Sequence, residues 1–203
     1  MSGHMHGARS HESSKIYRIA ICGRAGAGKT TLANALSDEI KLRTGKAASI
    51  VGFADKLKDV CREIFRMESK DRELLQGVGT ALRSIRDTVW IDYLMDNHVT
   101  GKTEPIIVHD VRYENEALRL LSAGFVLVHL HVDRKIQIDR GRITGHDHDS
   151  ESSTDELIKY AHMHARSSTP EDLKRLVNMA LQSVRTVAAM QGPSMHWEYG
   201  VVS

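Results

Sequence analysis

Residues 23–36, GRAGAGKTTLANAL, directly follow a short apolar run, IYRIAIC, at residues 16–22. The stretch contains the pattern G-x-x-x-x-G-K-[ST], which is satisfied by Gly23, Gly28, Lys29 and Thr30. The glycines let the backbone turn its N–H groups inward, and a helix beginning at the lysine adds its positive N-terminal end. The stretch therefore predicts a phosphate-binding loop between a strand and a helix.

In such a loop the lysine reaches the β- and γ-phosphates of a nucleotide, and the hydroxyl of the next residue binds Mg²⁺. We therefore expect ATP and Mg²⁺ as cofactors, with Thr30 as a metal ligand. The residues expected to contact the nucleotide are Gly23, Ala25, Gly26, Ala27, Gly28, Lys29, Thr30 and Thr31. GTPases, motor ATPases and small-molecule kinases share this loop, so the rest of the chain must distinguish between them.

Apolar, β-branched runs alternate with helical patterns along the chain, which is typical of an α/β fold with a parallel sheet. We expect a central sheet of about five strands, at residues 17–22, 49–54, 105–110, 125–132 and 160–164. Helices are expected at 29–43, over most of 55–100 with one interruption at 76–80, at 114–123 and at 170–190.

Composition and charge narrow the range of functions that the sequence favours. The 203 residues carry 28 Lys and Arg against 26 Asp and Glu, a formal charge of +2, so neither a nucleic-acid partner nor a membrane surface is indicated. Two cysteines cannot form a disulfide framework, which predicts a reducing, cytoplasmic setting. Residues 1–14 contain no apolar segment and are expected to be a flexible leader outside a single domain at 15–203.

Asp110 stands at the end of the third expected strand, and Arg112 follows two residues later. An Asp in that position can hold Mg²⁺ together with Thr30, and the alternative is a helix cap. Arg112 falls on a loop where open α/β sheets bind ligands, and its alternative is an ion pair with Glu114 or Glu116. Both residues are candidates for the site.

Residues 77–90, GVGTALRSIRDTVW, place Arg83, Arg86 and Trp90 three and four positions apart, on one face of an expected helix. Because a guanidinium grips phosphate oxygens in a bidentate manner, the two arginines suit a monophosphate acceptor. The glycines before them predict a helix N-terminus that could also receive an anion. The alternative is a solvated basic face with Trp90 in the core.

The stretch 134–153 is polar and contains Arg134, Arg140 and Arg142. A segment that lays arginines over the transferring phosphoryl group is a lid, and it also excludes water. The alternative is an ordinary surface loop.

Several further motifs occur in a characteristic order: FADKLKDVCREIF, LQGVGTALRSIRDTVW, HDVRYENEA and DHDSE. With the phosphate-binding loop, this combination resembles the bacteriophage deoxynucleoside monophosphate kinases over residues 16–184. The resemblance implies a P-loop nucleoside monophosphate kinase fold with an acceptor-binding insertion at about 55–100 and a lid at about 134–153. It also implies transfer of the γ-phosphoryl group of ATP to a deoxynucleoside monophosphate.

The family also implies roles for individual residues. Asp55 and Lys58 would lie beside the acceptor, Arg83 and Arg112 would clamp its phosphate, and Arg140 would act from the lid. His148, Ser150 and Glu151 would contact the lid or the acceptor. Two departures are visible: Lys56 stands where the family usually has proline, and Arg166, Ser167 and Ser168 replace a usual Asn-Gly.

Two rival functions follow from the same motifs. One is a kinase of the same architecture whose acceptor is another small phosphorylated molecule, such as phosphomevalonate. The other is a regulatory P-loop protein that binds nucleotide without phosphorylating anything. The sequence leaves the preferred base and the oligomeric state open, although the family favours a homodimer.

Overall fold

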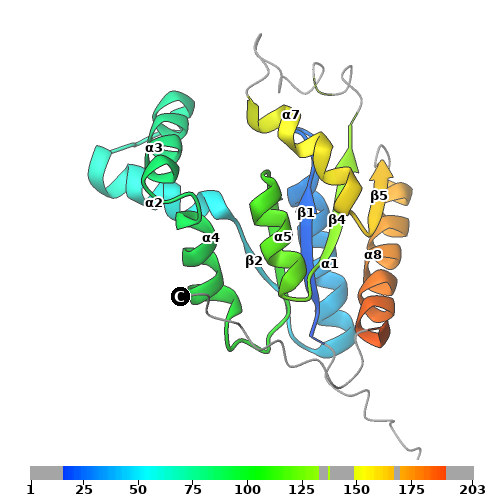
Figure 1. Ribbon diagram of the computed structural model, residues 1–203. Coiled ribbons are helices and arrows are strands. Elements are labelled where there is room, and N and C mark those ends of the chain that lie inside the picture. Colours follow the sequence, from blue (N-terminus) through cyan, green and yellow to red (C-terminus); the bar gives the residue numbers. More distant parts are fainter. Residues whose placement is uncertain (1–15, 133–136, 138–148, 167–169, 191–203) are drawn as a thin grey trace, which may run out of the picture.

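The computed structural model describes residues 16–132, 137, 149–166 and 170–190 (Figure 1). A single sheet contains five parallel strands in the order β2-β3-β1-β4-β5. These strands are β1 (Arg18–Cys22), β2 (Ser49–Val51), β3 (Ile106–Val111), β4 (Val126–His131) and β5 (Met163–Arg166). The predicted α/β class, with about five parallel strands flanked by helices, is confirmed.

Helices cover both faces of this sheet, as a parallel sheet requires. The N-terminal half contributes α1 (Lys29–Thr44), α2 (Phe53–Phe65), α3 (Arg72–Ile85), α4 (Val89–Leu94) and the π-helical turn η1 (Met95–Val99). The C-terminal half contributes α5 (Glu114–Ser122), α7 (Asp149–Glu156), the 3-10 turn η2 (Leu157–Tyr160) and α8 (Pro170–Met190). No helix among the described residues is both long and apolar enough to cross a bilayer.

Two hydrophobic clusters lie on opposite faces of the sheet. Alternate residues of β1 supply both: Ile19 and Ile21 pack against α1 and α8, whereas Ala20 and Cys22 pack on the side of α2, α4 and α5. This arrangement is visible in Figure 1, where α5 lies on one side of β1 and β4 and α8 on the other. The strands are therefore fixed in position from both sides, which holds the loops at their carboxyl ends.

The phosphate-binding loop begins at a point where only glycine fits. Gly23 has φ +137°, and a Cβ built on it would lie 2.2 Å from the backbone oxygen of Leu130 in β4. A side chain would therefore collide with a neighbouring strand as well as strain the backbone. The helix that follows, α1, ends at Thr44, one residue beyond the expected 29–43, and Gly45 caps it in the left-handed conformation.

The region after β2 differs from its prediction. The strand ends at Val51 and α2 begins at Phe53, so the expected strand 49–54 is too long. The expected interruption at 76–80 is also wrong, since α3 is continuous through those residues. The helical region is interrupted instead at 66–71 and at 86–88. Gly79 is buried and faces Leu57 of α2, with a Cβ position 3.2 Å from that side chain. Because Gly79 has no side chain, α2 and α3 can pack closely here, and the glycine does not end a helix.

The fifth strand is displaced by three residues from the expected 160–164. β5 begins at Met163, which pairs with Val128, because Leu157–Tyr160 forms a 3-10 turn that brings the chain back to the sheet edge. The final helix spans Pro170–Met190, as predicted.

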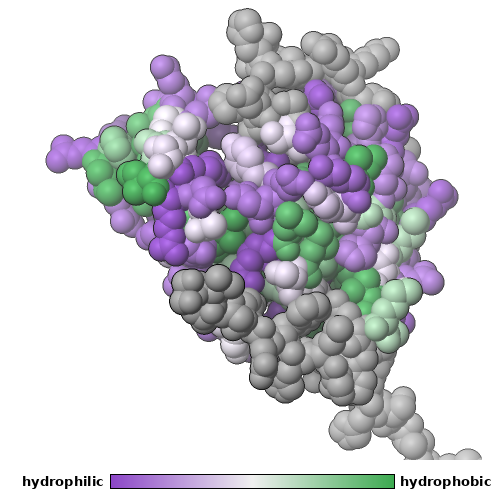
Figure 2. Space-filling model, in the orientation of Figure 1, coloured by the Kyte–Doolittle hydropathy of each residue, from purple (hydrophilic) through white to green (hydrophobic). Residues whose placement is uncertain are grey.

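Figure 2 shows apolar surface over the region of α2 and α3, where Ile64, Phe65 and Ile85 are exposed.

Candidate functional site

The candidate site lies where the carboxyl ends of β2, β3 and β1 meet. These three strands are neighbours in the sheet, and Cys22 at the end of β1 pairs with Val111 of β3. Asp110 therefore stands beside the beginning of the phosphate-binding loop. This edge is where open α/β sheets bind ligands.

Lys29 lies folded over the loop from the first turn of α1. Its Nζ donates hydrogen bonds to the backbone oxygens of Gly23, at 2.6 Å, and Arg24, at 2.9 Å. The ammonium group is therefore held where loop N–H groups and the positive end of α1 also gather, an environment suited to a phosphate. Thr30 is exposed next to it.

Cys22 lies directly before this loop and is completely buried. Burial raises the pKa of its thiol to about 12, and the positive charge of Lys29 offsets this only in part. Because a thiol with such a pKa stays protonated at neutral pH, Cys22 is a core residue and has no nucleophilic role.

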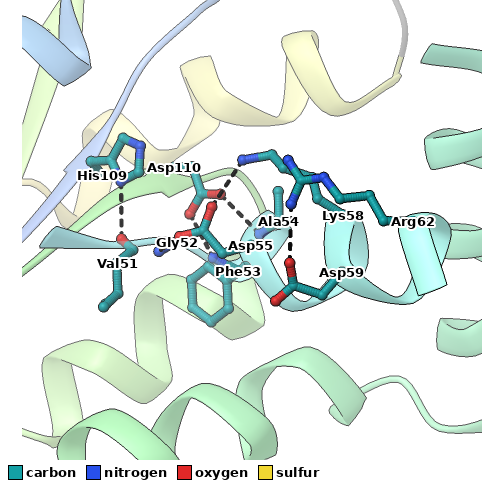
Figure 3. Close-up of polar contacts among 10 residues, drawn as sticks. All are labelled: Val51, Gly52, Phe53, Ala54, Asp55, Lys58, Asp59, Arg62, His109 and Asp110. Carbon is teal, nitrogen blue, oxygen red and sulfur yellow. Dashed lines mark hydrogen bonds and ion pairs between the residues drawn. The ribbon is translucent and has the colours of Figure 1, made fainter. Parts of the chain in front are cut away.

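Asp110 caps a helix that is distant from it in the sequence. Its Oδ1 accepts the N–H of Phe53 at 2.8 Å, and its Oδ2 accepts the N–H of Ala54 at 3.0 Å (Figure 3). A Cβ on Gly52 would lie 2.6 Å from the same carboxylate, so the preceding glycine makes room for it. Asp110 is therefore a helix cap, which was the alternative interpretation, but it caps α2 and not the helix that follows it in the sequence.

Asp55 and Lys58 form a local pair on α2. The Oδ2 of Asp55 accepts the N–H of Gly52 at 2.8 Å, and its Oδ1 accepts from Nζ of Lys58 at 2.8 Å. Figure 3 shows this pair beside the carboxylate of Asp110 at the start of the helix. Asp55 also lines a cavity of about 180 Å³ together with Trp90 and His98. Both predicted acceptor residues of α2 thus lie at the edge where the strands end.

Arg83 approaches the segment that contains Arg112. Its Nη2 lies 3.4 Å from Oε1 of Glu116, and its guanidinium carbon lies 4.5 Å from the centre of the Tyr113 ring. The other oxygen of Glu116 accepts the backbone N–H groups of Arg112, at 2.9 Å, and Tyr113, at 3.2 Å. The structure therefore brings together Arg83 and the backbone of Arg112, which are far apart in the sequence.

Glu116 itself is the group that the sequence identified only as a partner for Arg112. It is 2% exposed, and burial raises its pKa to about 7, with Asp110 adding to this effect. The N–H of Arg112, the charge of Arg83 and the N–H of Tyr113 oppose the rise. The signal for its role was a Glu three residues into a helix, where it can fold back onto the N-cap.

Arg86 and Trp90 do not share a helix face with Arg83, so that prediction is wrong. Arg86 stands after the end of α3 and pairs with Oδ2 of Asp92 at 2.7 Å, with its side chain 67% exposed. Trp90 belongs to α4 and is buried in the core. Since α3 runs through Gly77 and Gly79, the helix N-terminus expected there does not exist either.

Four of the predicted lid and acceptor residues lie outside the described residues: Arg134, Arg140, Arg142 and His148. Ser150 and Glu151 belong to α7. Two described residues of this part of the chain contact the phosphate-binding loop. Nε2 of Gln137 donates to the backbone oxygen of Ala25 at 2.7 Å, and Nη2 of Arg24 lies 2.7 Å from Oδ2 of Asp155. The sequence analysis did not predict either contact.

Among the described residues, no three His, Cys, Asp or Glu side chains are arranged to hold a metal ion. Thr30 and Asp110 therefore remain predicted ligands. Each carboxylate oxygen of Asp110 accepts a backbone hydrogen bond from α2 and has a second lone pair, which a cation could use.

A glycine-rich loop after β1 of a five-stranded parallel sheet, with kinase-like strand order and helices on both faces, defines a P-loop kinase-like fold. The family model AAA_18, described as an AAA domain, matches residues 19–159. The chain belongs to this family. A comparison with curated proteins finds no match.

Solved structures share the fold at low sequence identity. A shikimate kinase from Aquifex aeolicus vf5 has a TM-score of 0.56 and 14% identity, and the match covers 84% of this chain and 98% of that chain. A shikimate kinase from Acinetobacter baumannii, solved in complex with shikimate, has a TM-score of 0.53 and 15% identity, with 85% and 95% covered. These similarities support the fold, and the resemblance to bacteriophage deoxynucleoside monophosphate kinases stays a prediction.

Proposed function

We propose that this protein transfers the γ-phosphoryl group of ATP to the phosphate of a deoxynucleoside monophosphate. The observation that carries the proposal is the convergence of two anion-binding elements on one sheet edge. The phosphate-binding loop with Lys29 follows β1. After the neighbouring β3, Arg83 and the backbone N–H of Arg112 both contact Glu116. One element suits a donor and the other an acceptor that is itself an anion.

The donor would bind along the loop between β1 and α1. Its β- and γ-phosphates would replace the backbone oxygens of Gly23 and Arg24 as partners of the Lys29 ammonium. The hydroxyl of Thr30 and the carboxylate of Asp110 would hold Mg²⁺. When bound, the cation neutralises the charge of the phosphates.

The acceptor would bind between α2, α3 and the segment after β3. Arg83 and Arg112 would grip its phosphate, because a guanidinium matches phosphate oxygens with two parallel N–H groups. Asp55 and Lys58 would contact its sugar or base from α2. The choice of a deoxynucleotide as the acceptor is supported by the family resemblance alone.

The chemistry needs positioning and charge neutralisation more than it needs a general base. The acceptor phosphate oxygen is already anionic and attacks the γ-phosphorus in line with the leaving ADP oxygen. Lys29 and the arginines stabilise the charge on the equatorial oxygens. In this proposal Arg134 and Arg140 close over the phosphates and exclude water.

The test is a coupled assay of ADP release with ATP and each of the four deoxynucleoside monophosphates, with phosphomevalonate as a further acceptor. We expect turnover with at least one deoxynucleotide, dependent on Mg²⁺ and absent without acceptor. Turnover with phosphomevalonate alone would replace the proposed acceptor. Tight ATP binding without product from any acceptor would favour a regulatory nucleotide-binding protein.

A further inference from the structure

Glu116 joins two parts of the site through its two carboxylate oxygens. Oε2 accepts the backbone N–H groups of Arg112 and Tyr113, which fixes the start of α5. Oε1 faces the other way and lies 3.4 Å from Nη2 of Arg83 in α3. The side chain is 3% exposed, so this link is shielded from solvent.

Capping alone does not explain a carboxylate at this position. A helix N-terminus needs an acceptor oxygen, and the neutral amide of glutamine supplies one at position 116 without the cost of burying a charge. Above its pKa of about 7, the ionised carboxylate adds attraction to a cation. Arg83 is the cation that faces it, with only 27% of its side chain exposed.

Arg83 is held from three sides but weakly on each. Nη1 lies 3.5 Å from the backbone oxygen of Gly79, Nη2 lies 3.4 Å from Glu116, and the guanidinium carbon lies 4.5 Å from the centre of the Tyr113 ring. These long contacts orient the guanidinium while leaving it able to form shorter hydrogen bonds with a bound anion.

We propose that Glu116 is the positioning residue for the acceptor phosphate: it draws Arg83 from α3 towards Arg112, so that the two arginines act together. Glu116 does not touch the substrate in this arrangement. The inference rests on the proposed function and adds to it the group that assembles the acceptor clamp.

The experiment compares steady-state kinetics of Glu116→Gln and wild type at about pH 8, above the pKa of Glu116, varying the acceptor and ATP separately. The glutamine keeps an acceptor oxygen for the cap and removes the charge that faces Arg83. We expect the acceptor KM to rise about tenfold, the scale of one charge-assisted hydrogen bond, while the KM for ATP stays unchanged. Glu114→Gln is the matched control, since it removes a charge from the same helical turn but contacts Tyr160 and Lys159.

The same substitution is then made in an Arg83→Ala background. If Glu116 acts through Arg83, Glu116→Gln has no further effect on the acceptor KM there. An unchanged acceptor KM in the single variant, or an equal and multiplicative effect in both backgrounds, overturns the inference. A purely structural role of Glu116 would produce an equal effect in both backgrounds.

Folding of each variant is checked by thermal melting at the assay pH. If Glu116→Gln does not fold, Glu116→Asp carries the test, because it keeps the charge but is one methylene shorter. Its acceptor KM is expected to rise, and the rise is expected to vanish in the Arg83→Ala background. A wild-type protein without turnover on any deoxynucleotide removes the proposed function and this inference together, whereas an active wild type with normal Glu116 variants removes the inference alone.

Discussion

Asp110 and Phe53 stand 57 positions apart in the sequence, and Oδ1 of Asp110 accepts the N–H of Phe53 at 2.8 Å. With the second bond to Ala54, this carboxylate fixes the start of α2 relative to the end of β3. The helix that carries Asp55 and Lys58 is therefore oriented by a residue that belongs to the candidate metal site.

Replacing Asp110 with Ala should destabilise the protein by about 1–2 kcal/mol, because two partly buried N–H groups of α2 lose their partner. Asp110→Asn should cost less, since its amide oxygen still accepts one of the two bonds. Urea unfolding of both variants measures this. An Asp110→Ala protein as stable as wild type would mean that the cap contributes nothing.

Replacing Lys29 with Ala should abolish phosphoryl transfer and leave the fold intact. The ammonium group binds the backbone oxygens of Gly23 and Arg24, and Lys29 belongs to neither hydrophobic cluster. ADP release and circular dichroism are the two measurements, with the exposed Lys41→Ala on the same helix as control. Near-normal turnover would remove Lys29 from the mechanism.

Replacing Arg83 with Ala should raise the acceptor KM at least tenfold and change the KM for ATP little, because the loss of a charge-assisted contact falls on the acceptor. Arg62→Ala is a suitable control, since Arg62 is exposed and pairs with Asp59 on α2. A collapse of ATP affinity alone would show that Arg83 serves the donor.

Replacing each of the two glycines of α3 with alanine should have different effects on the free energy of unfolding. Gly77 is exposed within the helix and has nothing within 4 Å of a Cβ position, so Gly77→Ala should stabilise the protein by about 0.5–1 kcal/mol. Gly79→Ala should gain nothing or destabilise, because its Cβ would press on Leu57. Equal stabilisation by both substitutions, measured by urea unfolding, would contradict the close packing of α2 and α3.

The raised pKa of Glu116 makes stability depend on pH. Its ordinary pKa is 4.5 and burial raises it to about 7 in the folded protein, so the folded state holds this proton more strongly than the unfolded chain does. The stabilisation is fully present below pH 4.5 and is lost as the pH rises through about 7.

This contribution should be on the order of 1–3 kcal/mol between those limits. Unfolding free energies measured between pH 5 and 8 should therefore fall more steeply with pH in wild type than in Glu116→Gln. Glu114→Gln should keep the wild-type slope in this range, because the hydrogen bond from Tyr160 lowers the pKa of Glu114. Identical slopes for Glu116→Gln and wild type would refute the raised pKa.

Local chemistry explains which features the sequence could predict. The loop at Gly23 and Lys29 depends on neighbouring residues, and so do the end of α1 at Gly45 and the start of α8 at Pro170. Their geometry follows from backbone conformations that few residue types allow. The alternation of apolar runs and helical patterns likewise predicted a parallel sheet.

Contacts between segments distant in the sequence explain why other predictions from the sequence were wrong or were not made. Gly77 and Gly79 favour an interruption when considered alone, but packing of Gly79 against Leu57 outweighs the helix cost of glycine. The spacing of Arg83, Arg86 and Trp90 suggested one face, yet the chain turns after Ile85. Polar residues are ordinarily exposed, so the burial of Glu116 and the distant partners of Asp110 had no signal in the sequence.

The loop that would grip the donor is in contact with chain segments on either side of residues 138–148: Gln137 bonds to Ala25, and Asp155 bonds to Arg24. If nucleotide binding alters these two contacts, the contacts change the affinity for the nucleotide by the same free energy, because thermodynamic coupling is reciprocal. Under the proposed function, the affinity for ATP would then depend in part on residues outside the loop.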